Sequence, residues 1–66
     1  MQNFLRTTRE KQNLSQSELA EKAGVSRQTI HAIENNSFIP SISLAMKIAV
    51  ILNIQPEHLF ELEDTD

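Results

Sequence analysis

The sequence contains no cysteine, so neither a disulfide bond nor a thiolate metal site can reinforce the fold. It also lacks tryptophan and tyrosine, and it has one glycine and two prolines among 66 residues. We find no internal repeat, no linker and no low-complexity tract. No apolar run reaches the roughly 18 residues that a membrane-spanning helix needs, and nothing resembles a signal peptide. We therefore expect a single cytoplasmic domain spanning residues 1–66 that does not interact with a membrane.

Positive charge is also scarce, because six lysines and arginines are outnumbered by nine aspartates and glutamates, giving a net charge of −3. A basic patch is the usual mark of a nucleic-acid-binding protein, so the overall charge argues against that class. The charge is uneven, however: residues 1–35 carry +1 and residues 36–66 carry −4. We interpret residues 61–66 as an acidic, solubilising tail. The alternative is a segment that binds a partner or repels DNA.

The chain lacks the residue patterns of an enzyme. It has no nucleophile with an accompanying base and orienting group, and no glycine-rich phosphate-binding loop. Neither His31 nor His58 has another metal ligand at helix or hairpin spacing. We therefore expect no catalytic site, no metal, no cofactor and no small-molecule ligand.

The sequence does contain two short helix patterns joined by a tight turn, between Leu14 and Asn35. Ser15 followed by Glu18 matches a capping box, in which each residue satisfies a backbone N–H of the other. Gly24 stands where a chain leaving a helix often needs a positive φ, and Ser26 is a second N-cap candidate. The pattern predicts helices over residues 16–23 and 27–35.

This segment resembles the helix-turn-helix of the Cro/cI-type (xenobiotic-response-element type) DNA-binding domain. The resemblance is carried by Leu14-Ser15-Gln16, Leu19-Ala20, Gly24-Val25-Ser26, Ile30 and Ile33-Glu34-Asn35. It continues through Pro40 and Leu44 and covers about residues 5–60. It implies an all-α, lambda-repressor-like fold of five short helices. The alternating residues Phe60–Glu63 allow a short terminal β-strand that could pair with residues 1–3.

The remaining elements follow from local signals. We expect a first helix over residues 3–12, a fourth over residues 42–52 and a last short helix starting at Pro56, a favoured first helical residue. Asparagine tolerates the left-handed conformation better than most residues. The helix ends at Asn13, Asn36 and Asn53 are therefore predicted to adopt it.

The resemblance implies that residues 27–35 form a recognition helix lying in the DNA major groove. Arg27 and Gln28 are candidates for base contacts, because a guanidinium group matches guanine and a carboxamide matches adenine. One turn later, Ala32 could meet a thymine methyl group, and His31 could lie near base edges or phosphate. The alternative for these residues is an ordinary solvated helix face.

The resemblance also suggests contacts with the DNA backbone. The start of the second helix has free N–H groups that suit a phosphate. The backbone-contact candidates are Gln16, Ser17, Thr29, Asn35 and Ser37. Family members often carry Lys or Arg in the loop after the recognition helix, where this chain has Asn36-Ser37-Phe38-Ile39. Each missing phosphate contact lowers the slope of log affinity against log salt by about 0.9, so we expect weaker non-specific binding.

Two further features bear on stability and assembly. By resemblance, Arg9 and Glu34 form an ion pair between the first and third helices; the alternative is two independent surface charges. The predicted helix over 42–52 is apolar almost all round, with only Ser43 and Lys47 polar, although a small domain cannot bury it on every side. We interpret the surplus as a homodimer interface formed by Phe38, Ile39, Ile42, Met46, Val50 and Phe60. A merely apolar surface is the alternative.

The favoured function is a sequence-specific, double-stranded-DNA-binding transcriptional regulator of a prokaryote or phage. We expect a repressor that binds an inverted-repeat operator as a homodimer. A second hypothesis is an antitoxin-like interaction module whose main partner is a basic protein. A third is a helix-turn-helix fold that has lost DNA binding, which the acidic balance would favour.

Overall fold

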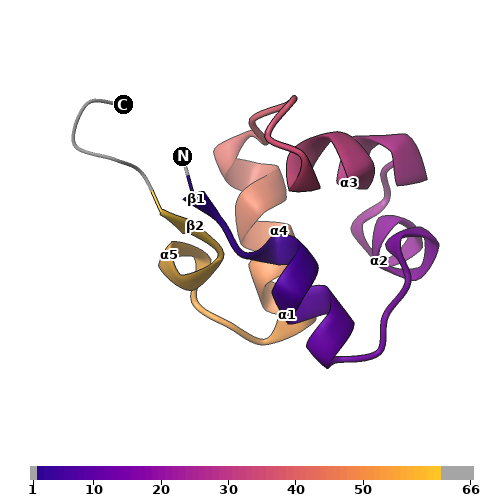
Figure 1. Cartoon of the computed structure of the whole chain (residues 1–66), viewed down its shortest axis with the longest axis horizontal. Coiled ribbons are helices and arrows are strands. Elements are labelled where there is room, and N and C mark those ends of the chain that lie inside the picture. Colours follow the sequence, from indigo (N-terminus) through magenta and orange to yellow (C-terminus); the bar gives the residue numbers. More distant parts are fainter. Residues whose placement is uncertain (1, 62–66) are drawn as a thin grey trace.

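The structure, a computed structural model, describes residues 2–61. Its elements follow the order β1 (Gln2–Asn3), α1 (Leu5–Lys11), α2 (Gln16–Ala23), α3 (Arg27–Glu34), α4 (Ile42–Leu52), α5 (Pro56–Leu59) and β2 (Phe60–Glu61) (Figure 1). The two strands pair antiparallel, with Gln2 opposite Glu61 and Asn3 opposite Phe60. The predicted five-helix fold and its short terminal strand are therefore confirmed. Most of the acidic tail, residues 62–66, lies outside the described residues, as does residue 1.

Three serines start the central helices. Ser15, Ser26 and Ser41 have extended backbones, and each hydroxyl oxygen accepts a hydrogen bond from the backbone N–H three residues later. At α2 the capping box is complete, because the Glu18 carboxylate also accepts from the Ser15 N–H at 2.9 Å. These caps satisfy N–H groups that have no partner within the helix. The sequence therefore fixes where α2, α3 and α4 begin.

Residues in the left-handed conformation follow the first four helices. Gly24 follows α2 with φ of 72°, and Asn53 follows α4 with φ of 56°. Asn13 and Asn36, just beyond α1 and α3, have φ of 59° and 60°. All four positions match the prediction, because glycine and asparagine tolerate this conformation.

The first helix is shorter than the predicted span of residues 3–12. Asn3 pairs in the β ladder, and its side-chain oxygen accepts a hydrogen bond from the Leu5 N–H at 2.9 Å. Its side-chain nitrogen donates to the Ile33 carbonyl oxygen. At the other end, the Gln12 amide donates to the Leu52 carbonyl oxygen at 2.7 Å. Both side chains form hydrogen bonds that link α1 to other parts of the fold, and both residues lie outside the regular helix.

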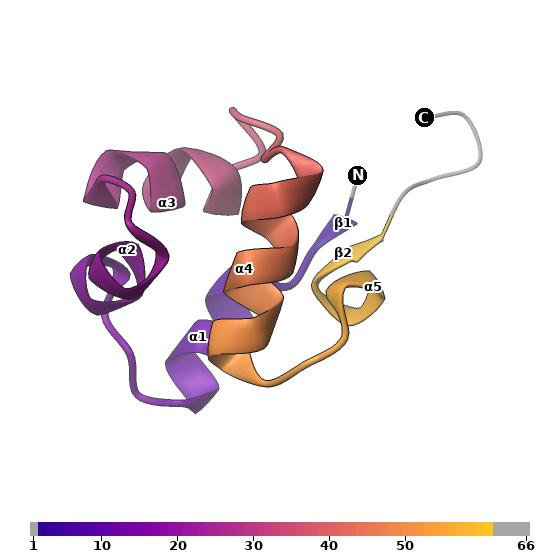
Figure 2. The same ribbon diagram turned by 180° about the vertical axis from the view of Figure 1, so that it is seen from behind.

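The core takes aliphatic side chains from every helix. The fully buried ones are Leu5, Leu19, Ile30, Ile33, Ile48, Leu52 and Leu59. Leu44 and Ile51 are half-buried and packed against it. Figures 1 and 2 show α3 lying across one end of α4, with α2 at one side of the molecule and α5 and the strands at the other. Within residues 2–61, no helix is both long enough and apolar enough to span a bilayer.

Candidate nucleic-acid interface

Helix α3 has one buried and one exposed face. Ile30 and Ile33 are both 0% exposed, and burying an isoleucine contributes about 1.5–3 kcal/mol. Arg27, Gln28 and His31 are exposed. The two isoleucines thus attach the helix to the core while three polar side chains of its outer face remain accessible to a ligand.

A recess flanks the start of α3. It measures about 340 Å³ and is lined by Ser26, Gln28, Thr29, Ala32 and Phe38. The Thr29 hydroxyl lies 2.9 Å from that of Ser26, so it participates in the N-cap. Ala32 is half-buried, which leaves part of its surface accessible. Phe38, a predicted interface residue, is 46% exposed and lines this recess beside α3.

An ion pair lies beneath the other half of α3. Arg9 Nε donates to Glu34 Oε2 at 2.7 Å, and Arg9 Nη2 donates to Glu34 Oε1 at 3.2 Å. Arg9 Nη1 also donates to the Leu14 carbonyl oxygen at 2.7 Å. The two side chains are 9% and 2% exposed. The hydrogen bond to Glu34 raises the pKa of Arg9, although burial opposes that change. The expected ion pair between α1 and α3 is thus present and is almost inaccessible to solvent.

Polar side chains extend from this pair toward the surface. Gln16 Nε2 donates to Glu34 Oε1 at 3.1 Å and lies 3.4 Å from His31 Nδ1. His31 Nε2 lies 2.9 Å from Asn35 Nδ2. A neutral imidazole has one acceptor nitrogen, so the shorter contact, with Asn35, is the favoured bond. Because a carboxylate only accepts, Glu34 fixes the orientation of the Gln16 amide, with its nitrogen facing inward.

A second recess lies where α1, α2 and α3 meet. It measures about 310 Å³ and is lined by Arg6, Arg9, Gln16, Arg27, His31, Glu34 and Asn35. Arg6 was not among the predicted site residues. It forms an exposed pair with Glu10 at 3.6 Å. The missed signal is helical spacing: Arg6 stands three residues before Arg9, so both lie on one face of α1.

The remaining predicted backbone contacts lie near the ends of α2 and α3. Ser17 is exposed in the first turn of α2. Ser37 is exposed after α3, and its N–H donates to the Ala32 carbonyl oxygen at 2.8 Å. Both side chains are accessible to solvent, but neither lines the recess formed by Gln16, Arg27, His31 and Asn35.

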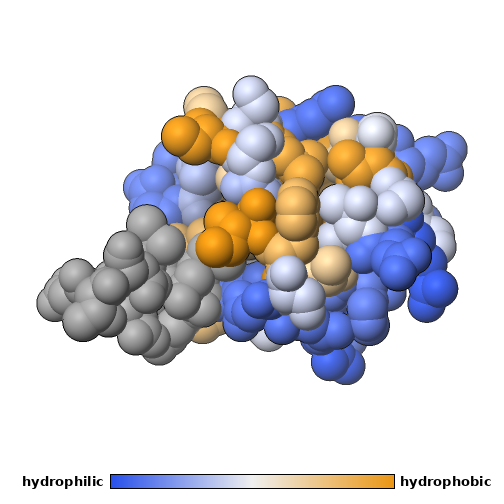
Figure 3. Space-filling view, turned by 90° about the horizontal axis from the view of Figure 1, so that it is seen from above, coloured by the Kyte–Doolittle hydropathy of each residue, from blue (hydrophilic) through white to orange (hydrophobic). Residues whose placement is uncertain are grey.

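A separate apolar surface covers α4 and α5. Ile42, Val50 and Ile39 are 81%, 78% and 71% exposed, and Met46 is 54% exposed. Figure 3 views the molecule from above, onto α3 and the following loop, and shows hydrophobic side chains gathered in the middle of the view with hydrophilic ones around them. Contiguous exposed apolar patches mark protein–protein or membrane interaction sites, or ligand-binding grooves.

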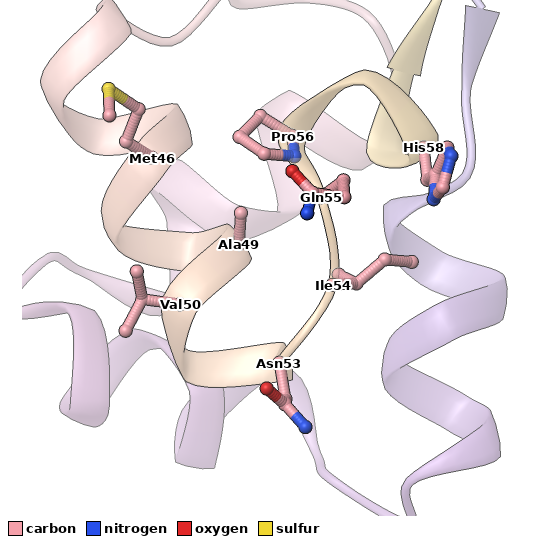
Figure 4. Close-up of a pocket in the computed structure, with 8 residues that line it drawn as sticks. All are labelled: Met46, Ala49, Val50, Asn53, Ile54, Gln55, Pro56 and His58. Atoms are coloured by element: carbon pink, nitrogen blue, oxygen red, sulfur yellow. The ribbon is translucent and has the colours of Figure 1, made fainter.

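This apolar surface contains a groove between α4 and α5. One part, about 340 Å³, is lined by Ile39, Pro40, Ile42, Ala45, Met46, Pro56, Glu57 and Phe60. The adjoining part, about 560 Å³, shares Met46 and Pro56 and continues past Ala49 and Val50 to Ile54 (Figure 4). Phe60, a predicted interface residue, is half-buried and packs against the core at the rim of this groove.

Comparison with known proteins places these features in a family. The family model described as helix-turn-helix matches residues 5–59. The uncharacterised HTH-type transcriptional regulator MJ0272 of Methanocaldococcus jannaschii is 47% identical over 66 residues, covering 100% of both chains.

Two solved structures have the same fold. The restriction-modification controller protein C.AhdI from Aeromonas hydrophila is 34% identical, with a TM-score of 0.80 and 85% of each chain covered. SinR, the master regulator for biofilm formation, was solved in complex with DNA; it is 35% identical with a TM-score of 0.74, covering 80% of this chain and 86% of that one. The sequence and the fold, including its helices α2 and α3, match those of these proteins. The chain belongs to the helix-turn-helix family of the Cro/cI type.

Proposed function

We propose that this protein is a transcriptional regulator that binds DNA sequence-specifically as a homodimer and represses transcription from an inverted-repeat operator. The observation that carries the proposal is the two-sided helix α3, with Ile30 and Ile33 buried and Arg27 and Gln28 exposed. The names of the compared proteins, which include regulators and one solved DNA complex, support it. A regulator of this kind acts in the cytoplasm, where prokaryotic DNA lies.

The dimensions of α3 suit the major groove. Its eight residues extend for about 12 Å at 1.5 Å per residue, and the groove is about 12 Å wide. With its N-terminal end inserted, Arg27 donates to guanine and Gln28 pairs with adenine. Ala32 and His31, one turn later, reach the next base edges or the adjacent phosphate.

Contacts with the DNA backbone would flank this helix. The first N–H groups of α2, at Gln16 and Ser17, lack partners within the helix and suit a phosphate. On the α3 side, Thr29, Asn35 and Ser37 supply hydroxyl and amide groups near the ends of the reading helix. Such contacts set the register of the protein on the duplex without specifying sequence.

The apolar surface of α4 and α5 supports the dimer. Ile39, Ile42, Met46 and Val50 are too exposed to stabilise a monomer, and a second copy would cover them. A two-fold dimer places two copies of α3 about 34 Å apart, in successive major grooves of one face of the duplex. Repression follows when the bound dimer blocks polymerase.

The test is selection of bound sequences from random DNA duplexes. We expect an enriched inverted repeat, and we expect Arg27→Ala and Gln28→Ala each to relax the preference at one base pair per half-site. Each loss should reduce discrimination by about 1–3 kcal/mol. Lys11→Ala removes an exposed charge that lines no recess near α3 and serves as the control. If no repeat is enriched, and Arg27→Ala binds like the wild type, the proposal is wrong.

A further inference from the structure

We propose that the recess between α1, α2 and α3 binds a phosphodiester of the DNA backbone, with Arg6 as its principal ligand. This inference rests on the proposed function and assigns the ligand of one particular site. The recess is lined by residues from three helices and opens beside Arg27 and His31 of α3. A phosphate bound there would lie next to the bases that α3 reads.

The charge of the recess suits an anion. Three guanidinium groups, of Arg6, Arg9 and Arg27, line it against a single carboxylate, that of Glu34. Arg9 already neutralises Glu34 through two hydrogen bonds, so the carboxylate repels an incoming phosphate only weakly. The remaining charge comes from Arg6 and Arg27. This excess of positive charge is local, because the chain as a whole carries −3.

Gln16 does not supply the charged donor that balances this phosphate. Its side-chain nitrogen faces Glu34 Oε1 at 3.1 Å and His31 Nδ1 at 3.4 Å. A carboxamide has two N–H donors, so one neutral N–H of Gln16 remains beside the backbone N–H groups of α2. A single neutral donor does not balance the charge of a phosphate. The charged side-chain donor must come from elsewhere, and Arg6 lines the same space.

Arg6 is available for this role. Its side chain is 70% exposed, and its contact with Glu10 at 3.6 Å is an exposed pair within one helix. Such pairs are weak and are further weakened by salt, so a phosphate can displace Glu10. Guanidinium groups bind phosphate with two parallel hydrogen bonds, which gives Arg6 an advantage over a single amide donor. Arg6 would replace cations that the loop after α3 lacks.

The salt dependence of DNA binding tests this site. Each phosphate contact contributes about 0.9 to the magnitude of the slope of log affinity against log salt. For a dimer with two such sites, the magnitude of this slope should therefore be about 1.8 smaller in the Arg6→Gln variant than in the wild type. The difference in affinity between wild type and variant should then shrink roughly tenfold between about 50 and 200 mM salt. Base preference in the selected sequences should stay unchanged. Circular dichroism should confirm folding, which we expect because Arg6 is exposed.

Two further variants serve as matched comparisons. Lys11→Gln removes the same charge from the same helix, but Lys11 does not line the recess, so its salt slope should match that of the wild type. Glu10→Gln removes the carboxylate that competes with phosphate for Arg6. We therefore expect Glu10→Gln to bind the operator more tightly at low salt.

Single methylphosphonate substitutions in the operator locate the phosphate. One neutralised position per half-site should weaken the wild type and leave the affinity of Arg6→Gln unchanged. If Arg6→Gln and Lys11→Gln share the wild-type slope, or if Arg6→Gln alters base preference instead, the phosphate site is wrong while the proposed function stands. If the wild type binds no duplex, both proposals are wrong.

Discussion

Removing the charge of Glu34 should cost a large part of the stability of this domain. Glu34→Gln keeps the size of the side chain but leaves the Arg9 guanidinium nearly buried, without its counter-charge. The loss of one partner from a buried ion pair costs about 3–5 kcal/mol. At about 0.05–0.15 kcal/mol per residue, the whole domain of 66 residues is stabilised by roughly 3–10 kcal/mol. The variant should therefore be marginally folded or unfolded.

Urea unfolding followed by far-UV circular dichroism measures this effect. With a slope of about 1 kcal/mol/M for a small domain, the midpoint of Glu34→Gln should fall by about 3 M. Glu10→Gln breaks the exposed pair with Arg6 and should lose less than about 1 kcal/mol. Because the pKa of Arg9 is raised, the stabilisation by the pair is complete at all lower pH values at which Glu34 is charged. Neutral pH is therefore suitable for the measurement.

A double variant separates the charge from the packing. Arg9→Met combined with Glu34→Leu removes both charges together, and hydrophobic replacement of a buried pair is often neutral or stabilising. The double variant should be more stable than either Glu34→Gln or Arg9→Met alone. A midpoint of Glu34→Gln within about 1 M of the wild type would refute the reasoning, since the pair would then contribute no more than an exposed one.

Three further outcomes are expected. Ile42→Glu should convert the proposed homodimer to a monomer in analytical ultracentrifugation, whereas Ser43→Glu, at the neighbouring exposed position of α4, should leave it dimeric; equal behaviour of the two variants would contradict the proposed interface. Hydrogen bonds from the N–H and hydroxyl of Ser15 lower the pKa of Glu18 below its ordinary value of 4.5. The charged Glu18 carboxylate therefore stabilises the folded state fully above pH 4.5, and this contribution is lost as the pH falls through the lowered pKa. The difference in thermal midpoint between wild type and Glu18→Gln should accordingly vanish in acid, and a difference that persists there would show that the charge is not the cause. Asn36→Ala should lose about 1–2 kcal/mol in urea unfolding because φ is 60°, whereas Asn36→Gly should stay close to the wild type.

Local chemistry made most of the fold predictable. A serine hydroxyl that bonds a backbone N–H three residues away requires no information from distant residues, so Ser15, Ser26 and Ser41 fix three helix starts. Asparagine and glycine at positive φ similarly mark the helix ends. The first helix was predicted too long because Asn3 pairs with Phe60, 57 positions away, and only the folded chain reveals that contact.

The candidate site was less predictable, for the same reason. The exposed face of α3 follows from the helical period, so Arg27 and Gln28 could be proposed from the sequence. The orientation of the Gln16 amide depends on Glu34, 18 residues away, and no spacing rule indicates that bond. Hydropathy placed Phe38 in the predicted interface with residues of α4, but it could not indicate that Phe38 also lines a recess beside α3.

The antiparallel pairing of β1 and β2 has a practical consequence for engineering. Gln2 and Glu61 lie opposite one another, at the end of the molecule away from α2 (Figures 1 and 2). A fluorescent label or fused domain attached at Gln2 or Glu61 would start from this edge and leave the helix-turn-helix uncovered. For the same reason, a short peptide loop joining residue 2 to residue 61 would permit a circularly permuted chain opened at another surface turn.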